Sequence, residues 1–123
     1  VSPDGSGSYF LPRLVGIRKA KELIFKNPLL SAEDALELGI VNEVVPAEGL
    51  MDAANALAKE FAAGPTRAYG EAKRLLADTL SNTLETQMEL ETRAICGLAG
   101  SSPDAKGAIG AFVAKEKYEF TGK

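Results

Sequence analysis

The sequence predicts a mainly α-helical fold with at most one short strand. Alanine and leucine, which favour helices, number 19 and 15, whereas valine and isoleucine, which favour strands, number 11 together. Apolar residues also recur at three- and four-residue spacing through most of the 123 residues. This length suffices for one domain with its own core. An all-β or parallel-sheet domain is therefore not expected.

The charge and the missing residue types exclude several kinds of function. The formal net charge is −3, and the sequence contains no histidine. A net negative charge argues against a broad nucleic-acid-binding surface, because such surfaces neutralise phosphates with lysine and arginine. Without an imidazole, any proton transfer has to use a carboxylate, lysine, tyrosine or cysteine.

The single cysteine, Cys96, indicates the compartment. It excludes a disulfide within the chain and a cysteine cluster for a metal, so we expect no metal site and a reducing, cytoplasmic environment. Its place in an apolar helical stripe predicts a small core residue. No apolar run reaches the roughly 18 residues of a membrane-spanning helix, and no leader opens the chain, so no membrane partner is expected.

The chain opens on a turn-rich stretch, residues 2–8, with the sequence SPDGSGS. Proline and glycine in such a stretch normally connect a preceding strand to a following helix. Because the first residue is Val1 and no element precedes the turn, we expect the chain to be the later part of a longer protein.

Residues 1–46 otherwise predict short helices and one strand. The helices are expected over residues 8–15, 17–25 and 32–38, with a break at Gly16 and a capping box at Ser31. Residues 40–45, with the sequence IVNEVV, are the one strand candidate. Its partner would lie in absent polypeptide, in another chain or in a small local pairing.

Residues 47–123 predict helices throughout. Pro65 and Pro103 each suit the first position of a helix, and Asn82 with Thr83 can cap another. We expect the core to form from four apolar stripes: Leu50, Ala53, Ala54, Leu57 and Phe61; Tyr69, Ala72, Leu75, Leu76 and Leu80; Leu84, Met88, Ile95 and Leu98; and Ala105, Ala108, Ile109, Phe112 and Val113.

Two local patterns could carry chemistry. The glycine-rich turn at residues 5–7 leads into a helix, whose free amides and positive dipole end suit an anion or a developing oxyanion. Asp4 lies beside it; the alternatives are a merely flexible turn and an aspartate bonded to local backbone. The basic and aromatic residues of 115–120 could bind a phosphate or nucleotide, although lysine is also common at helix C-termini.

Four stretches together resemble the crotonase superfamily of enoyl-CoA hydratases and isomerases. They are SPDGSGSYFLPRLVG at 2–16, LSAEDALELGIVNEVVP at 30–46, AAGPT with AKRLL at 62–76, and GAIGAFVAK at 107–115. The resemblance covers essentially the whole chain and implies the C-terminal half of such a protein. The family's N-terminal β-spiral core, its two oxyanion-hole amides and the upstream glutamate of hydratases have no counterpart here. The resemblance further implies an active-site edge over 1–46 and a helical trimerisation region over 47–123.

The resemblance assigns three candidate site residues. Asp4 is the catalytic candidate, since hydratases tend to have glycine there, related isomerases a proton-moving aspartate, and chlorobenzoyl-CoA dehalogenases a nucleophilic aspartate. Phe112 and Lys115 match positions that approach the adenine and phosphates of coenzyme A bound mainly to a neighbouring subunit. Coenzyme A would enter only as part of the substrate, with no separate cofactor.

The expected activity of the parent protein is therefore isomerisation of an enoyl-CoA through a stabilised enolate. Hydration of a 2-enoyl-CoA is the alternative within the family. A non-catalytic acyl-CoA binder and an inert helical oligomerisation module also remain open, and the chain alone is expected to be inactive.

Overall fold

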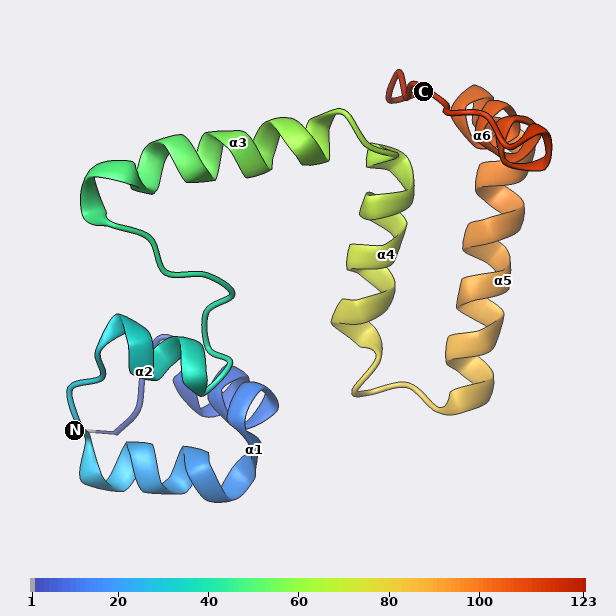
Figure 1. The fold of residues 1–123 in the computed structure, drawn as a ribbon. Helices are drawn as coiled ribbons and strands as arrows, with labels where there is room; N and C mark the ends of the chain where they lie inside the picture. Colours follow the sequence, from blue (N-terminus) through green and yellow to red (C-terminus); the bar gives the residue numbers. More distant parts are fainter. Residues whose placement is uncertain (1) are drawn as a thin grey trace. The chain divides into compact units, whose positions relative to one another are not determined.

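The computed structural model describes residues 2–123, which form helices joined by turns and loops, with no strand among them (Figure 1). The mainly α-helical prediction is thus confirmed. The chain divides into two compact units, one ending at Leu50 and the other comprising Met51–Lys123. The elements are α1 (Gly7–Lys26), α2 (Ala32–Glu37), a 3₁₀ turn (Ala47–Gly49), α3 (Leu50–Ala62), α4 (Thr66–Asp78), α5 (Leu84–Ser101) and α6 (Pro103–Ala114).

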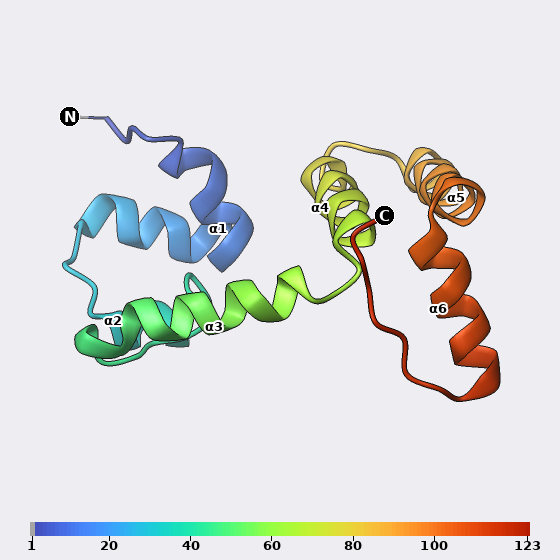
Figure 2. The same cartoon turned by 90° about the horizontal axis from the view of Figure 1, so that it is seen from above.

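Helix α1 consists of two helical segments that meet at Gly16 (Figure 2). Gly16 has φ 77° and ψ 156°, a conformation that is essentially restricted to glycine. The predicted break between residues 8–15 and 17–25 is therefore correct. The second segment ends at Asn27, whose left-handed backbone lets its N–H donate to the carbonyl of Leu23 over 2.8 Å.

Helix α2 begins with the predicted capping box. The hydroxyl of Ser31 accepts from the backbone N–H of Asp34 at 3.0 Å, and the Asp34 carboxylate accepts from the Ser31 N–H at 3.1 Å. The Ser31 hydroxyl also donates to the Asp34 carboxylate at 2.7 Å, and this bond, together with the one from the Ser31 N–H, holds the pKa of Asp34 below its ordinary value. The short helix is thereby fixed at its start by two residues three positions apart.

The strand predicted over residues 40–45 is wrong. These residues form bends and irregular backbone, and no strand lies within 2–123 to pair with them. The backbone N–H groups of Ile40 and Val41 instead donate to the carbonyl of Ala35, at 2.8 and 3.3 Å, and so close the end of α2. Gly39, with φ 69°, makes this return possible. A β-ladder would need these same N–H donors, so the hydrogen bonds that close the end of α2 exclude strand pairing at Ile40 and Val41.

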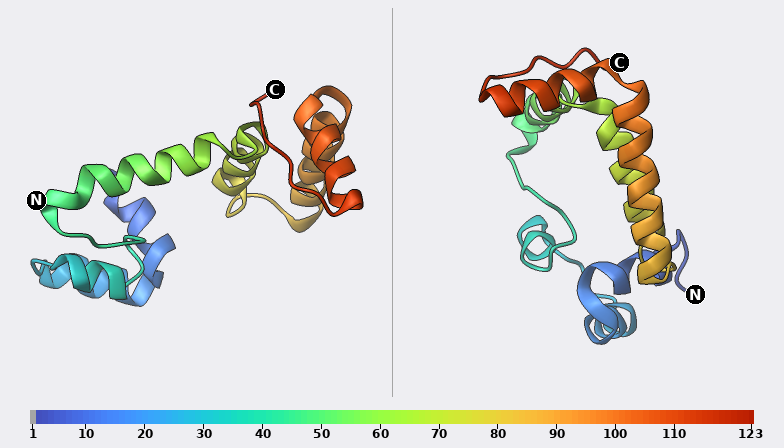
Figure 3. Two further views of the ribbon diagram at one scale, coloured as in Figure 1. Left: turned by 45° about the horizontal axis from the view of Figure 1, so that its top comes forward. Right: turned by 90° about the vertical axis from the view of Figure 1, so that its right-hand side faces the viewer.

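In the second unit α4 and α5 lie side by side, and α6 packs against α5 (Figure 3). The turn between α4 and α5 is held by Gln87, which donates to the Leu75 carbonyl at 3.1 Å and accepts from Asn82 at 2.9 Å. Thr83 caps α5, as predicted. Ser102 caps α6 by accepting from the Ala105 N–H at 3.2 Å, with Pro103 in the first position, as predicted.

The apolar stripes lie on helices as predicted, except for Leu80, which follows the end of α4. Few of their side chains are buried. Among residues 2–123 the buried apolar residues are Ala20 and Ala94, whereas Ile95 is 69% exposed. Cys96 is exposed as well, so its assignment to the core is wrong. The reason is physical: periodicity fixes which residues share a helix face, but burial also needs a neighbouring element to cover that face.

Candidate functional site

Asp4 lies in the turn that leads into α1. Its carbonyl accepts from the Gly7 N–H at 2.9 Å, and Gly5 and Ser6 have left-handed backbones, with φ 54° and 62°. The Asp4 side chain is exposed, and its carboxylate has no hydrogen bond within residues 2–123. The expectation of an aspartate bonded to local backbone thus holds for the carbonyl and not for the carboxylate.

The amides at the start of α1 are mostly used inside the turn. Those of Tyr9 and Phe10 donate to the Ser6 carbonyl at 2.9 and 3.0 Å, and that of Gly7 donates to Asp4. These three amides are therefore unavailable to an anion in this conformation. The group of the turn that remains free to meet a ligand is the Asp4 carboxylate.

An aromatic and cationic cluster follows Asp4 on the first turns of α1. The rings of Tyr9 and Phe10 meet edge to face at 5.1 Å. The guanidinium of Arg13 lies 3.6 Å from the centre of the Tyr9 ring and donates to the Tyr9 carbonyl at 2.9 Å. Sequence reasoning missed Arg13 as a site residue, although its position four residues after Tyr9 already predicts that the two side chains meet.

Phe112 and Lys115 lie together at the C-terminal end of α6, in the other unit. Phe112 is 83% exposed, and Lys115 is exposed and ends the helix with φ 58°. The Lys115 N–H donates to the Phe112 carbonyl at 3.2 Å. The structure thus places an ammonium and an aromatic ring one helical turn apart, and both can reach a ligand.

The most heavily hydrogen-bonded side chain described is that of Asp104, in the first turn of α6. It is 5% exposed and accepts from Tyr118 and from the last three residues of the chain. Burial by itself would raise the pKa of Asp104, but the hydrogen bonds from Thr121 and its neighbours outweigh burial and hold the pKa below its ordinary value. No local pattern could reveal contacts that span 14 to 19 residues.

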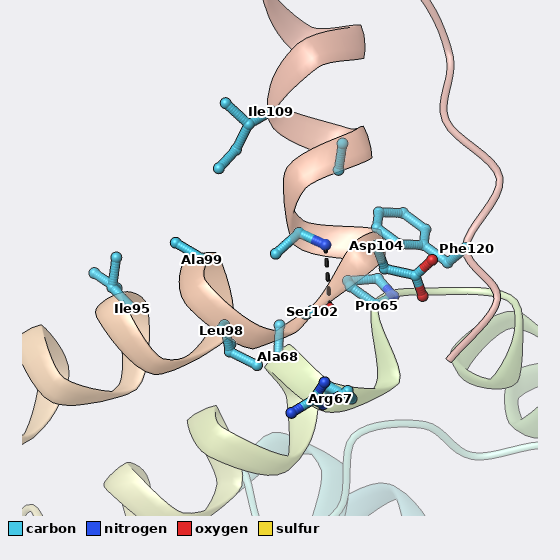
Figure 4. Close-up of a pocket in the computed structure, with 12 residues that line it drawn as sticks. Pro65, Arg67, Ala68, Ile95, Leu98, Ala99, Ser102, Asp104, Ile109 and Phe120 are labelled. Carbon is cyan, nitrogen blue, oxygen red and sulfur yellow. Dashed lines mark hydrogen bonds between the residues drawn. The ribbon is translucent and has the colours of Figure 1, made fainter. Parts of the chain in front are cut away.

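Beside Asp104 lies an apolar cavity of about 300 Å³ within the second unit (Figure 4). Its walls come from the start of α4, the end of α5, the start of α6 and the C-terminal segment, through residues that include Ala68, Leu98, Ala99, Ile109 and Phe120. Arg67 and Asp104 provide polar atoms at its margin.

Residues 2–123 hold neither a metal-binding cluster nor a membrane-spanning helix. No cluster of three histidine, cysteine, aspartate or glutamate side chains that could hold an ion occurs there. None of the helices described is both long and apolar enough to cross a bilayer.

The helical fold is that of the C-terminal helical region of a crotonase-like protein. The model of the enoyl-CoA hydratase/isomerase family matches residues 1–123. The chain belongs to this family.

Individual relatives agree with this assignment. The chain is 41% identical over 121 residues to the 1,2-epoxyphenylacetyl-CoA isomerase of Escherichia coli K12, covering 98% of the chain and 46% of the relative. It is 33% identical over 119 residues to the short-chain-enoyl-CoA hydratase of Clostridium acetobutylicum, covering 97% and 45%. A crystal structure of an enoyl-CoA hydratase/isomerase from Cupriavidus metallidurans matches with a TM-score of 0.86 at 34% identity, covering 99% and 46%. The chain therefore spans about half the length of these relatives.

Proposed function

We propose that the protein to which this chain belongs acts on an acyl-CoA thioester and moves the double bond of an enoyl-CoA. The observation that carries the proposal is the Asp4 carboxylate, which is exposed in the turn that leads into α1 and is not engaged by other groups of residues 2–123. A carboxylate used for proton transfer has to be free to approach its substrate. Family membership supports the thioester, since both relatives described above are named for coenzyme A substrates.

In this mechanism Asp4 takes a proton from one carbon of the acyl chain, and the electrons of the broken C–H bond delocalise into the thioester as an enolate. The double bond shifts, and Asp4 returns the proton to a different carbon, so no oxidant or reductant is consumed. Backbone amides outside this chain would stabilise the enolate oxygen, at roughly 3 to 4 kcal/mol for each donor. The chain alone is then inactive, because it lacks those donors.

The C-terminal end of α6 is the proposed contact for the coenzyme A part of the substrate. Lys115 offers a point charge to a phosphate, and the ring of Phe112 can lie against the adenine. Their exposure at one end of α6 supports this role. As in the family pattern, the ligand would be bound mainly by a neighbouring subunit of a homotrimer in the cytoplasm.

Two alternatives each have an observation in their favour. Hydration of a 2-enoyl-CoA is favoured by the identity to a short-chain-enoyl-CoA hydratase. A purely structural role in assembly is favoured by the exposed apolar faces of the helices, for example at Leu76 (70%) and Val113 (78%).

The test compares the full-length protein with its Asp4→Asn variant on 3-enoyl-CoA and 2-enoyl-CoA. We expect isomerase turnover to fall by about 10² to 10⁴, because the amide neither accepts nor returns the proton. Asp52→Asn, at an exposed first-turn aspartate of α3, is the matched control and should keep full activity. Unchanged turnover in Asp4→Asn removes Asp4 from the mechanism; loss of 2-enoyl-CoA hydration alone favours the hydratase; no turnover by the parent protein favours the assembly role.

A further inference from the structure

The carboxylate of Asp104 binds three consecutive backbone amides at the end of the chain. The N–H groups of Thr121, Gly122 and Lys123 donate to its Oδ2 at 2.9, 2.7 and 3.1 Å. Asp104 is 5% exposed, so these bonds are shielded from water and are charge-assisted. The side chain of Asp104, in the first turn of α6, therefore forms a binding site for the extended C-terminal residues Thr121–Lys123. We call this site the receptor.

Side chains add to this receptor from both partners. The hydroxyls of Thr121 and Tyr118 donate to Oδ1 of Asp104 at 2.9 and 3.1 Å. The buried hydroxyl of Ser102 donates to the Lys123 carbonyl at 2.5 Å. The Tyr118 ring lies directly on Gly107, where any Cβ would overlap it. The receptor is thus complementary to one sequence pattern. This pattern is a tyrosine hydroxyl (Tyr118), a threonine three residues later (Thr121) and a glycine directly after it (Gly122).

Residues 116–123, here called the strap, are attached to the rest of the unit mainly at this receptor. They contain no helix or strand and turn back along α6 (Figure 2). Every hydrogen bond found for residues 117–123 ends on Ser102 or Asp104. At the other end the strap leaves α6 through the left-handed Lys115. A segment whose hydrogen bonds converge on two residues and that joins its helix at a bend can leave and return as a unit.

Movement of the strap would change the apolar cavity. Phe120 forms one wall of that cavity, near Pro65 and Asp104 in Figure 4. The Phe120 ring also meets the Tyr118 ring edge to face at 5.2 Å, so the residue that contacts the receptor and the residue that closes the cavity are in direct contact. Release of Tyr118 from Asp104 would therefore withdraw Phe120 from the cavity.

We propose that the strap is a hinged cover latched by Asp104, and that its undocking opens the apolar cavity between α4, α5 and α6. The latch is made by hydrogen bonds to a carboxylate, and the cover is the ring of Phe120. This device is separate from Asp4 and does not depend on the proposed reaction.

The test places a reporter on the strap. Residues 1–123 contain no tryptophan, so in the full-length protein Phe120→Trp adds an indole at the cavity wall, and the unsubstituted protein gives the background signal of any tryptophan outside these residues. In this background Asp104→Asn replaces one acceptor oxygen by an NH₂ group that faces the same amide donors. We expect exchange of the Thr121–Lys123 amides to accelerate about tenfold or more, and acrylamide quenching of the indole to increase. Amides in the middle of α6 should keep their exchange rates.

Asp52→Asn in the same background is the matched control, because Asp52 is also a first-turn aspartate but has no bond to a distant segment. It should change neither readout. The proposal is overturned if Asp104→Asn leaves strap exchange and quenching unchanged, or if Asp52→Asn changes them equally. Should α6 itself lose protection in Asp104→Asn, Tyr118→Phe decides: it removes one donor, so a rise of a few fold supports the latch and no rise overturns it.

Discussion

Substitution of two glycines in α6, Gly107 and Gly110, tests the docking of the strap without any change to Asp104. An alanine methyl at Gly110 would meet nothing within 4 Å, whereas at Gly107 it would overlap the ring of Tyr118. Both substitutions remove a glycine from a helix interior, which stabilises by about 1 kcal/mol. Gly110→Ala should therefore raise the unfolding temperature by about 2 to 4 °C, the shift expected per kcal/mol for a protein of 150 to 250 residues.

Gly107→Ala gains the same helix propensity but displaces Tyr118, so we expect it to lose that advantage and to free the strap. The assay is thermal unfolding by circular dichroism together with amide exchange of Thr121–Lys123. The expected result is a gap of about 1 kcal/mol or more between the two variants, with faster strap exchange only in Gly107→Ala. Equal stabilisation by both variants, with unchanged strap exchange, would refute the reasoning.

Three further predictions concern titration, capping and substrate binding. Because hydrogen bonds depress the pKa of Asp104 below 3.8, docking of the strap should be complete above that value and be lost as the pH falls through the depressed pKa; the indole reporter measures this, and the step should be absent in Asp104→Asn. Tyr118, the other titratable group at the receptor, has a raised pKa through burial and its bond to Asp104, so it stays protonated over this range. Ser31→Ala should cost about 1 kcal/mol of local stability in α2, seen as faster exchange of its amides; no acceleration would contradict the capping role. Lys115→Gln should raise the KM for acyl-CoA with little change in kcat, whereas Lys117→Gln should alter neither; equal effects would argue against a phosphate contact at Lys115.

Most helix limits could be predicted from the sequence because their causes are local. Ser31 with Asp34 and the break at Gly16 depend on residues within one or two turns. The strand at 40–45 failed for a reason that is also local but not visible in hydrophobicity. The Ala35 carbonyl takes the Ile40 and Val41 donors, and a β-rich composition does not reveal that competition.

Burial and the strap could not be predicted because they depend on distant groups. The apolar periodicity around Ile95 and Cys96 predicted a helix, but it could not show that both side chains are exposed. Asp104 was recognisable as a first-turn acid, yet its bonds to Thr121 and Gly122 cross 17 and 18 residues of chain. The roles of Asp4, Phe112 and Lys115 stay predictions, because a role depends on the substrate as well as on the position of the side chain.

The bend inside α1 restricts which residues can replace Gly16. Gly16 adopts backbone angles that side chains with a Cβ do not tolerate, so one achiral residue sets the direction of everything before it. Any replacement there would tend to fuse the two segments into one straight rod. The acidic turn and the Tyr9–Arg13 pair would then be carried away from where they point now, although neither had itself been altered.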